Sequence, residues 1–146
     1  MPTIFFGSDH AGYLMKNIII DVLDNEQDMD IKDLGCFNLD KCNYPEFAFR
    51  VAKKVRETPN SFGVLLCGTG IGMSIAANKV KGIRCALCSN FTQVQMSRKH
   101  NDANILALGA RNTTSDTLIP LIMAFINTEF DGGRHQIRVN MIDNMD

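Results

Sequence analysis

Features that mark membrane, secreted and nucleic-acid-binding proteins are missing from this sequence of 146 residues. It has no tryptophan, and no window approaches the roughly 18 uncharged apolar residues that span a bilayer. Its 15 Lys and Arg residues nearly balance 16 Asp and Glu residues, so the net charge of −1 predicts neither nucleic-acid nor membrane-surface binding. The first residues lack the cationic lead and apolar stretch of a secretion signal, and we therefore expect a cytoplasmic protein.

The five cysteines also lack the pattern of a disulfide framework. They are odd in number and scattered along the chain, which indicates reduced thiols. Cys85 and Cys88 have the spacing of a redox pair, but they end an apolar run instead of opening a helix, so packing is the preferred interpretation. No second close pair of Cys or His residues completes a zinc site, and we predict no metal.

Five apolar runs alternate with helix-like segments along the chain. The runs cover residues 3–7, 31–35, 63–67, 83–88 and 104–109, and glycine or polar residues bound each of them. Parallel strands need crossover connections, so this alternation predicts an α/β fold, a three-layer α/β/α sandwich around a Rossmann-like five-stranded parallel sheet. The length favours a single domain over residues 1–146, with a tail from about residue 131 that packs on the site or on a partner.

Apolar periodicity and the positions of prolines predict three helices, two between these runs and one after the last run. The first pattern has two neighbouring rows, Leu14, Ile18 and Val22 beside Met15, Ile19 and Leu23, and we expect the stripe to face the core. Pro45 suits the first turn of a helix over residues 47–56. The last pattern runs from 114 to 127 and contains Pro120, which should kink that helix or move its start toward Pro120.

Polar residues follow the predicted strands at the edge where parallel α/β sheets bind ligands. They are Ser8, Asp9 and His10, the segment from Cys67 to Gly72, Ser89 and Asn90, and the segment from Gly109 to Arg111. The glycines at 68, 70 and 72 do not match the dinucleotide fingerprint, because Met73 stands where its third glycine belongs, and no Lys followed by Ser or Thr completes a P-loop. This turn is either an amide cradle for an anion or enolate oxygen, or simply a tight strand-to-helix corner.

Cys67 precedes the predicted helix start, where the helix dipole favours a thiolate. It could act as a base or nucleophile, although a lone cysteine that ends a strand is more often a packing residue. The three histidines, His10, His100 and His135, lie in polar clusters, so each could reach one common pocket in an acid or base role.

Arg134 and Arg138 lie four residues apart in the tail, on one face if the tail is helical. Two planar guanidinium groups suit a phosphate, and the alternative is a solvated basic face.

Several ordered motifs resemble type B ribose-5-phosphate isomerase, in the family that also holds galactose-6-phosphate and allose-6-phosphate isomerases. They are Gly7-Ser8-Asp9-His10-Ala11-Gly12, Cys67-Gly68-Thr69-Gly70-Ile71-Gly72-Met73-Ser74, Ser97-Arg98-Lys99-His100-Asn101-Asp102, Gly109-Ala110-Arg111 and Gly132-Gly133-Arg134-His135-Gln136-Ile137-Arg138. The resemblance extends from the first strand to about residue 140.

The resemblance implies an aldose-ketose isomerase that works through a cis-enediolate, without metal or organic cofactor. It implies a homodimer whose cleft uses residues of both subunits, and it leaves open whether dimers pair into tetramers. Another branch of the family uses a Glu as the base at the position of Met73. Because the Met73 side chain of this sequence cannot accept a proton, the resemblance favours Cys67 as the base.

The remaining site residues are implied in the same way. Thr69 and the amides of Gly68, Gly70, Ile71 and Gly72 would hold the enediolate, and His100 assisted by Asn101 would open the sugar ring. Asp9 and Tyr44 would contact sugar hydroxyls or assist ring opening. The phosphate would be bound by His10, Arg134 and Arg138, with Arg111 from the other subunit.

The preferred function is the interconversion of ribose 5-phosphate and ribulose 5-phosphate. Pocket depth decides between five-carbon and six-carbon sugar phosphates, so allose-6-phosphate and galactose-6-phosphate isomerase remain alternatives. A noncatalytic phosphosugar-binding module would keep the arginines and glycines without needing Cys67 or His100. A metallohydrolase using Asp9, His10 and His100 is disfavoured, since their spacing fits no common ligand motif.

Overall fold

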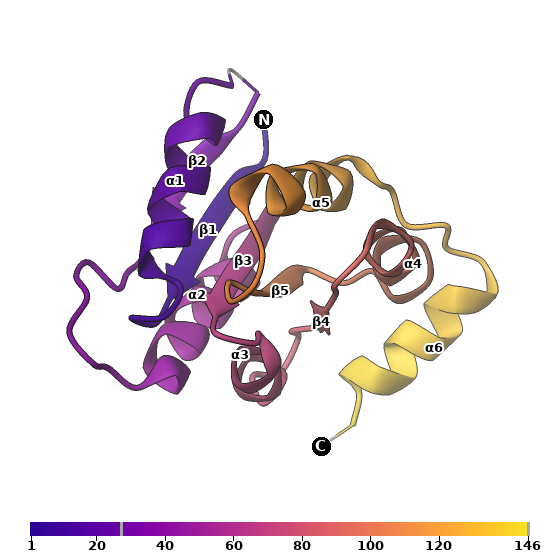
Figure 1. Cartoon of the computed structure of the whole chain (residues 1–146). Helices are drawn as coiled ribbons and strands as arrows, with labels where there is room; N and C mark the ends of the chain where they lie inside the picture. Colours follow the sequence, from indigo (N-terminus) through magenta and orange to yellow (C-terminus); the bar gives the residue numbers. More distant parts are fainter. Residues whose placement is uncertain (27, 146) are drawn as a thin grey trace.

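The strands pair in parallel in the order β2-β1-β3-β5-β4, and helices cover both faces of the sheet (Figure 1). This computed structural model describes residues 1–26 and 28–145. The strands are β1 (Thr3–Ser8), β2 (Asp30–Asp33), β3 (Ser61–Cys67), β4 (Cys85–Leu87) and β5 (Ile105–Gly109). The helices are α1 (Tyr13–Leu23), α2 (Tyr44–Glu57), α3 (Ile71–Ala77), α4 (Phe91–Asn101), α5 (Ser115–Asn127) and α6 (Arg134–Asp143). The predicted three-layer sandwich is confirmed.

Alternate side chains of each strand enter opposite halves of the core, as the two-residue period of a strand requires. On β1, Ile4 and Phe6 join the half covered by α1, α4 and α5, while Phe5 joins the half covered by α2 and α3. Cys67, the last residue of β3, belongs to the second half together with Met73 of α3. The chemistry predicted for Cys67 therefore concerns the α2 and α3 side of the sheet.

The first helix faces the core with a different set of residues from the one expected. Leu14, Ile18 and Val22 are 59%, 50% and 46% exposed, whereas Ile19 and Leu23 are buried. The prediction that the Leu14 row faces the core is wrong, because the two apolar rows of α1 lie side by side and only one of them can turn toward the sheet.

The two prolines expected in helices occupy different positions. Pro45 lies in the first turn of α2, as predicted, where its missing N–H breaks no helical hydrogen bond. Pro120 lies inside α5, which begins at Ser115, so the start of the helix is not moved to Pro120. Within residues 1–26 and 28–145, no helix combines the length and apolar character needed to cross a membrane.

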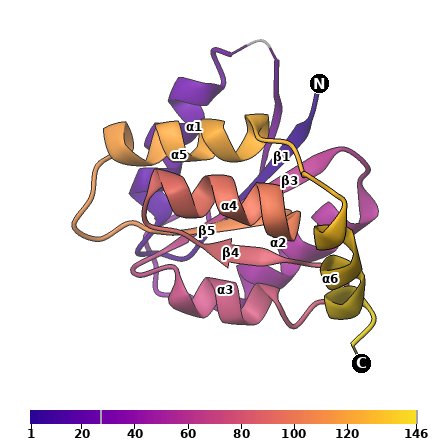
Figure 2. The same ribbon diagram turned by 90° about the vertical axis from the view of Figure 1, so that its right-hand side faces the viewer.

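Helix α4 runs back along the sheet, and this direction decides where its last residues lie. It starts after the carboxyl end of β4 and finishes before the amino end of β5, so its eleven residues cover about 16 Å from one edge of the sheet to the other. Figure 2 shows α6 beyond the end of α4, on the side away from the arrowhead of β4. The tail therefore lies at the amino edge of the sheet.

Candidate active site

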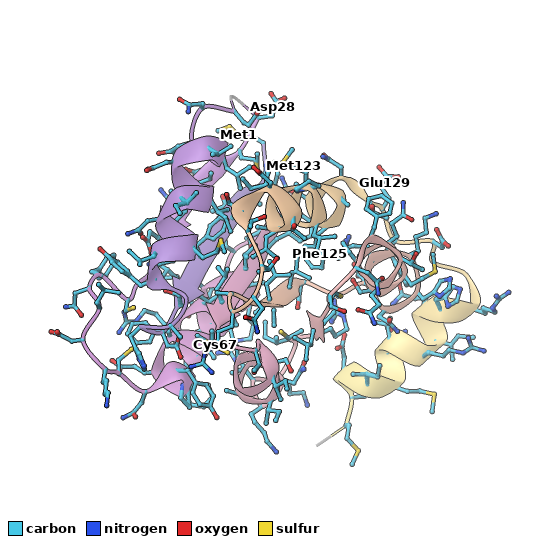
Figure 3. The ribbon with its side chains drawn as sticks, in the orientation of Figure 1. Met1, Asp28, Cys67, Met123, Phe125 and Glu129 are labelled. Carbon is cyan, nitrogen blue, oxygen red and sulfur yellow. The ribbon has the colours of Figure 1, made fainter. Side chains whose placement is uncertain are left out.

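The predicted site residues fall into two separate groups. The sheet-end group, Asp9, His10, Tyr44, Cys67, Thr69 and Arg111, lies in the loops and helix starts that follow β1, β2, β3 and β5. A cavity of about 650 Å³ opens beside it, lined among others by Gly68, Thr69, Gly109 and Arg111. In Figure 3, Cys67 lies at the opposite end of the sheet from Met1, Met123 and Glu129, which line a second cavity of about 600 Å³ without predicted site residues.

Cys67 is held by the first turn that follows its strand. The backbone N–H of Gly70 donates a hydrogen bond to the Cys67 Sγ at 3.1 Å. This hydrogen bond fixes the position of the sulfur relative to the turn. The side chain is only 6% exposed, so the sulfur lies just inside the protein while its neighbours Gly68 and Thr69 line the cavity.

Two glycines permit the shape of this turn. Gly70 has φ of 81°, in the left-handed region, and a Cβ there would lie 2.9 Å from the carbonyl carbon of Leu108. A Cβ on Gly72 would lie 2.6 Å from the ring of Tyr44. The bare backbone of Gly72 therefore lets Tyr44, at the start of α2, pack directly on the first turn of α3, and it brings the phenol into the sheet-end group.

Some of the amides predicted to cradle an enediolate already have partners. The N–H of Ile71 donates to Thr69 Oγ1 at 3.2 Å, and the N–H of Gly70 donates to the sulfur. Thr69 itself is exposed and lines the cavity. Fewer backbone N–H groups of residues 68–72 are thus available to an enediolate than predicted, because Cys67 and Thr69 accept hydrogen bonds from two of them.

Asp9 and His10 follow β1, and each has a local hydrogen bond. The buried Asp9 accepts a bond on Oδ1 from the N–H of Gly12 at 3.1 Å, which holds the turn leading into α1. The Nδ1 of His10 faces the backbone N–H of Cys42 at 3.3 Å. Since an amide can only donate, this contact requires Nδ1 as the acceptor, and the ring N–H of that tautomer is then on Nε2.

Arg111 belongs to the sheet-end group of its own chain. Its backbone N–H donates to the carbonyl of Gly68 at 3.1 Å, and its guanidinium covers Gly68 so closely that a Cβ there would lie 2.8 Å from Cζ. The loop after β5 brings the guanidinium over the turn that follows β3 within this chain, and the supply of Arg111 to the site of the other subunit stays a prediction.

The helix-end group, His100, Asn101, Arg134 and Arg138, lies at the ends of α4 and α6. The His100 ring stacks on that of His135, with centroids 4.3 Å apart and planes 11° from parallel. Burial lowers the pKa of His135, and His100, Arg134 and Arg138 lower it further by like-charge repulsion. His135 therefore holds a proton less readily than an ordinary histidine.

Arg98 fixes the segment that carries His100 and Asn101, a role that the sequence motif alone did not reveal. Its buried guanidinium donates to Asp102 Oδ1 at 2.9 Å and to the carbonyl of Thr128 at 3.1 Å. Asp102 has φ of 47° and ends α4 in the left-handed conformation. The planar guanidinium of Arg98 thus fixes the C-terminal end of α4 through these hydrogen bonds.

Both ends of α6 are tied to the body of the protein. The Nη1 of Arg84 lies 2.9 Å from each carboxylate oxygen of Asp143, near the last turn of α6. At the other end, the N–H of Asp131 donates to the carbonyl of Lys99 at 3.0 Å. Arg134 and Arg138 are exposed on this anchored helix, so their guanidinium groups face outward and can reach another molecule.

The two groups do not share a pocket within one chain. Cys67 lies at the carboxyl edge of the sheet, and His100 lies at the end of α4 that returns to the amino edge. Within one chain, His100 and His135 therefore lie at the opposite edge of the sheet from His10, and a pocket that holds all three histidines needs a second subunit. The separation of His100 from Cys67 could have been predicted from the alternation of strands and helices, because a crossover helix returns the chain to the edge of the sheet at which the strands start.

The sequence interpretation also missed Lys16, which is fully buried on α1. Its Nζ donates to Asp33 Oδ1 at 2.6 Å and to the carbonyl of Cys36 at 2.6 Å. This pair fixes the loop after β2, which leads to Cys42 and so to the contact with His10. The sequence feature that could have revealed it is a single lysine within an apolar helix pattern. A lysine can be buried there only beside a carboxylate that pairs with its charge.

The second pair of cysteines does not fit a reactive role. Burial raises the pKa of Cys85 to about 12 and also raises that of Cys88. A redox or nucleophilic cysteine needs a lowered pKa, since the thiolate is the reactive form. These two residues therefore act as packing residues, as the sequence interpretation preferred.

The carboxyl edge of this parallel sheet brings together a thiol, a carboxylate, an imidazole and a guanidinium. Such a set of groups at this edge is typical of an enzyme that acts on a small molecule. The chain matches the family described as Ribose/Galactose Isomerase over residues 4–142. It belongs to that family, and the recognition made from its sequence motifs is confirmed.

Relatives and solved structures agree with this assignment. The chain is 40% identical to "Ribose-5-phosphate isomerase B" of Escherichia coli over 142 residues, which cover 97% of this chain and 95% of the relative. Ribose-5-phosphate isomerase B of Clostridium thermocellum has a TM-score of 0.92 at 44% identity and covers 97% of this chain and 95% of its own. That of Thermotoga maritima has a TM-score of 0.94 at 38% identity and covers 99% of each chain.

Proposed function

We propose that this protein interconverts ribose 5-phosphate and ribulose 5-phosphate through a cis-enediolate, with Cys67 as the base. The observation that carries the proposal is the hydrogen bond from the N–H of Gly70 to the Cys67 Sγ, next to the cavity lined by Thr69 and Arg111. A base for this reaction must lie close to two neighbouring carbons, and the hydrogen bond from the Gly70 amide holds the sulfur beside the cavity in which those carbons would lie. Relatives named ribose-5-phosphate isomerase B support the five-carbon substrate.

The proposed proton transfer takes place between two neighbouring carbons of the open-chain sugar. The thiolate of Cys67 removes the proton from C2 of the open-chain aldose, and the electron pair of that C–H bond forms the enediolate as charge moves to the carbonyl oxygen. The hydroxyl proton of O2 then passes to O1, which moves the negative charge to O2, and returning the first proton to C1 forms the C2 carbonyl of the ketose. The exposed hydroxyl of Thr69 and the remaining amides of the turn stabilise the charged oxygen, and one such donor is worth about 2.7 to 4 kcal/mol.

We further propose that the active form is a homodimer. Ring opening by His100 requires the helix-end group beside the sugar, yet one chain holds that group at the opposite edge of the sheet from Cys67. In a two-fold dimer, the helix-end group of each subunit can meet the sheet-end group of the other, which makes two equivalent sites. A tetramer would be a pair of such dimers. We place the reaction in the cytoplasm, where free thiols remain reduced.

The phosphate is the part of the substrate that the cationic groups fit. His10 offers Nε2–H, because its Nδ1 accepts from the Cys42 amide, and Arg134 and Arg138 of the second subunit add two guanidinium groups four residues apart on α6. Arg111 lies over Gly68 in its own chain. Binding energy at the phosphate orients the reacting carbons without touching them.

Replacing the base tests this proposal. Cys67→Ala should lower kcat for ribose 5-phosphate by at least about 100-fold, because acid–base catalysis by a positioned group contributes about 10² to 10⁴. Binding of a nonreactive pentitol 5-phosphate should stay within threefold, and Cys85→Ala is the matched control that should keep kcat. Near-normal turnover by Cys67→Ala would contradict the assignment. Comparing kcat/KM for ribose 5-phosphate and allose 6-phosphate decides between the five-carbon and six-carbon alternatives, and binding without any turnover would support the noncatalytic module.

A further inference from the structure

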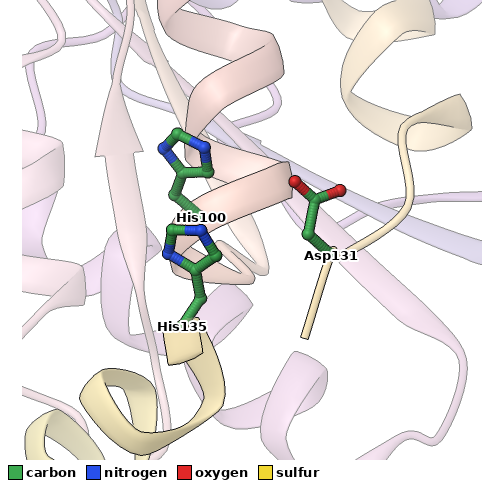
Figure 4. Close-up of side chains that lie close together, drawn as sticks. All are labelled: His100, Asp131 and His135. Carbon is green, nitrogen blue, oxygen red and sulfur yellow. The ribbon is translucent and has the colours of Figure 1, made fainter. Parts of the chain in front are cut away.

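Three metal-binding side chains come together at the junction of α4 and α6. His100, Asp131 and His135 each bring a donor atom to one place, and all these atoms lie within 4.8 Å of one another (Figure 4). They come from three different segments, the end of α4, the loop before α6 and the first turn of α6. Two imidazoles and one carboxylate form the three-ligand set found in zinc enzymes that leave a fourth position open.

The backbone holds this arrangement in place. The N–H of Asp131 donates to the carbonyl of Lys99, the residue before His100, at 3.0 Å. Gly132 and Gly133 both have positive φ, and the N–H of His135 donates to the carbonyl of Gly132 at 3.1 Å. This short turn puts Asp131 and His135 on the same side, against the end of α4.

We propose that His100, Asp131 and His135 form a site for a divalent ion of the zinc type, and that the bound ion inhibits the enzyme. In tetrahedral coordination the donor atoms lie about 3.4 Å apart, so the widest separation must shorten. Asp131 is exposed and its side chain can rotate toward the rings. The ring planes, now 11° from parallel, must tilt toward each other so that both lone pairs meet at the ion.

The surrounding charge selects the kind of metal. Lys99, Arg134 and Arg138 are cationic neighbours on α4 and α6, and Asp131 is the single anionic ligand. Ca²⁺ and Mg²⁺ bind chiefly through several oxygen ligands and anionic charge, which this site supplies only through Asp131. Zn²⁺ and Cu²⁺ bind imidazole strongly, so they are the ions that tolerate this environment.

The inhibition rests on the proposed function, whereas metal binding does not. A His100 nitrogen that coordinates Zn²⁺ has its lone pair engaged and cannot carry the proton needed to open the sugar ring. The ion also lies beside Arg134 and Arg138, where the substrate phosphate is proposed to bind. Zinc should therefore lower the turnover of cyclic substrate and be displaced by EDTA.

Calorimetric titration of the full-length, EDTA-treated protein with ZnCl₂ in phosphate-free buffer tests the site. One ion should bind per chain, and Asp131→Asn and His135→Gln should each weaken binding at least about 100-fold, since loss of even an outer-shell partner costs about 10- to 100-fold. Cys42→Ser is the matched control for a thiol-based site near His10 and should bind zinc as the wild type does. Loss of binding in Cys42→Ser with full binding in Asp131→Asn would overturn the proposal.

Two further measurements distinguish zinc bound by His100 and His135 from phosphate bound by the neighbouring arginines. In two-bond ¹H–¹⁵N spectra of the imidazoles, ZnCl₂ should shift the signals of His100 and His135 and leave those of His10 in place. Signals that respond to inorganic phosphate and not to ZnCl₂ would overturn the metal site. Asp131→Asn should isomerise ribose 5-phosphate at the wild-type rate and resist zinc; equal inhibition of both proteins would refute the inhibitory role. A protein that binds zinc at these residues but never isomerises the sugar would refute the proposed function alone.

Discussion

Removing the buried ammonium of Lys16 tests how the loop after β2 is held. In Lys16→Met the side chain stays unbranched and becomes one heavy atom shorter, and the Nζ bonds to Asp33 Oδ1 and the Cys36 carbonyl, both at 2.6 Å, are lost. Each bond involving a charged group contributes about 1.5 to 3 kcal/mol. Asp33 is 28% exposed and also accepts from the N–H of Gly35, so water and this amide offset part of the loss. We expect the free energy of unfolding to fall by about 3 kcal/mol, the low end for breaking a buried ion pair.

Urea unfolding at a fixed protein concentration measures this change, since association contributes to the stability of an oligomer. Lys32→Met is the matched control, because Lys32 and Asp30 form a surface pair at 3.6 Å with 54% and 42% exposed side chains. It should change stability by no more than about 0.5 kcal/mol. A loss below about 1 kcal/mol in Lys16→Met, or equal losses in the two variants, would refute the reasoning.

Three further changes test the site. His100→Asn should reduce turnover of cyclic ribose 5-phosphate more than that of the open-chain form, measured by stopped-flow assay with freshly released aldehyde, and equal losses would contradict ring opening by His100. Arg138→Ala should raise KM for ribose 5-phosphate at least about tenfold with little change in kcat, since it removes binding remote from the reacting carbons, and an unchanged KM would contradict phosphate binding there. Gly72→Ala places a Cβ 2.6 Å from the Tyr44 ring, so kcat/KM should fall at least about tenfold while the melting temperature changes by only a few degrees. Unchanged kinetics in Gly72→Ala would show that Tyr44 makes no contact with the sugar.

The sequence predicted the sheet well, because strands buried on both faces appear as short apolar runs. The runs at 3–7, 63–67 and 104–109 correspond closely to β1, β3 and β5. The edge strand β4 has only three residues and is shorter than its run at 83–88, since an edge position has one neighbour to pair with. Hydrophobic pattern therefore located the central strands more sharply than the edge.

Helix orientation could not be predicted as well. The two apolar rows of α1 are equivalent in sequence, and only the structure reveals that Ile19 faces the core while Ile18 is exposed. The burial of Lys16 depends on Asp33, a partner seventeen residues away that no local pattern identifies. The polar clusters around the histidines likewise suggested a common pocket for them, whereas within one chain the direction of α4 places His100 at the opposite edge of the sheet from Cys67.

Complementation between two inactive variants tests the central claim most directly, that each site joins the sheet-end group of one subunit to the helix-end group of another. Cys67→Ala and His100→Asn each damage both sites of a homodimer, but a heterodimer of the two retains one undamaged site. After unfolding and refolding of an equal mixture, half of the dimers are mixed, so turnover of cyclic ribose 5-phosphate should recover to about a quarter of the wild-type value. Heterodimers detected by native mass spectrometry without any recovery of turnover would contradict the account.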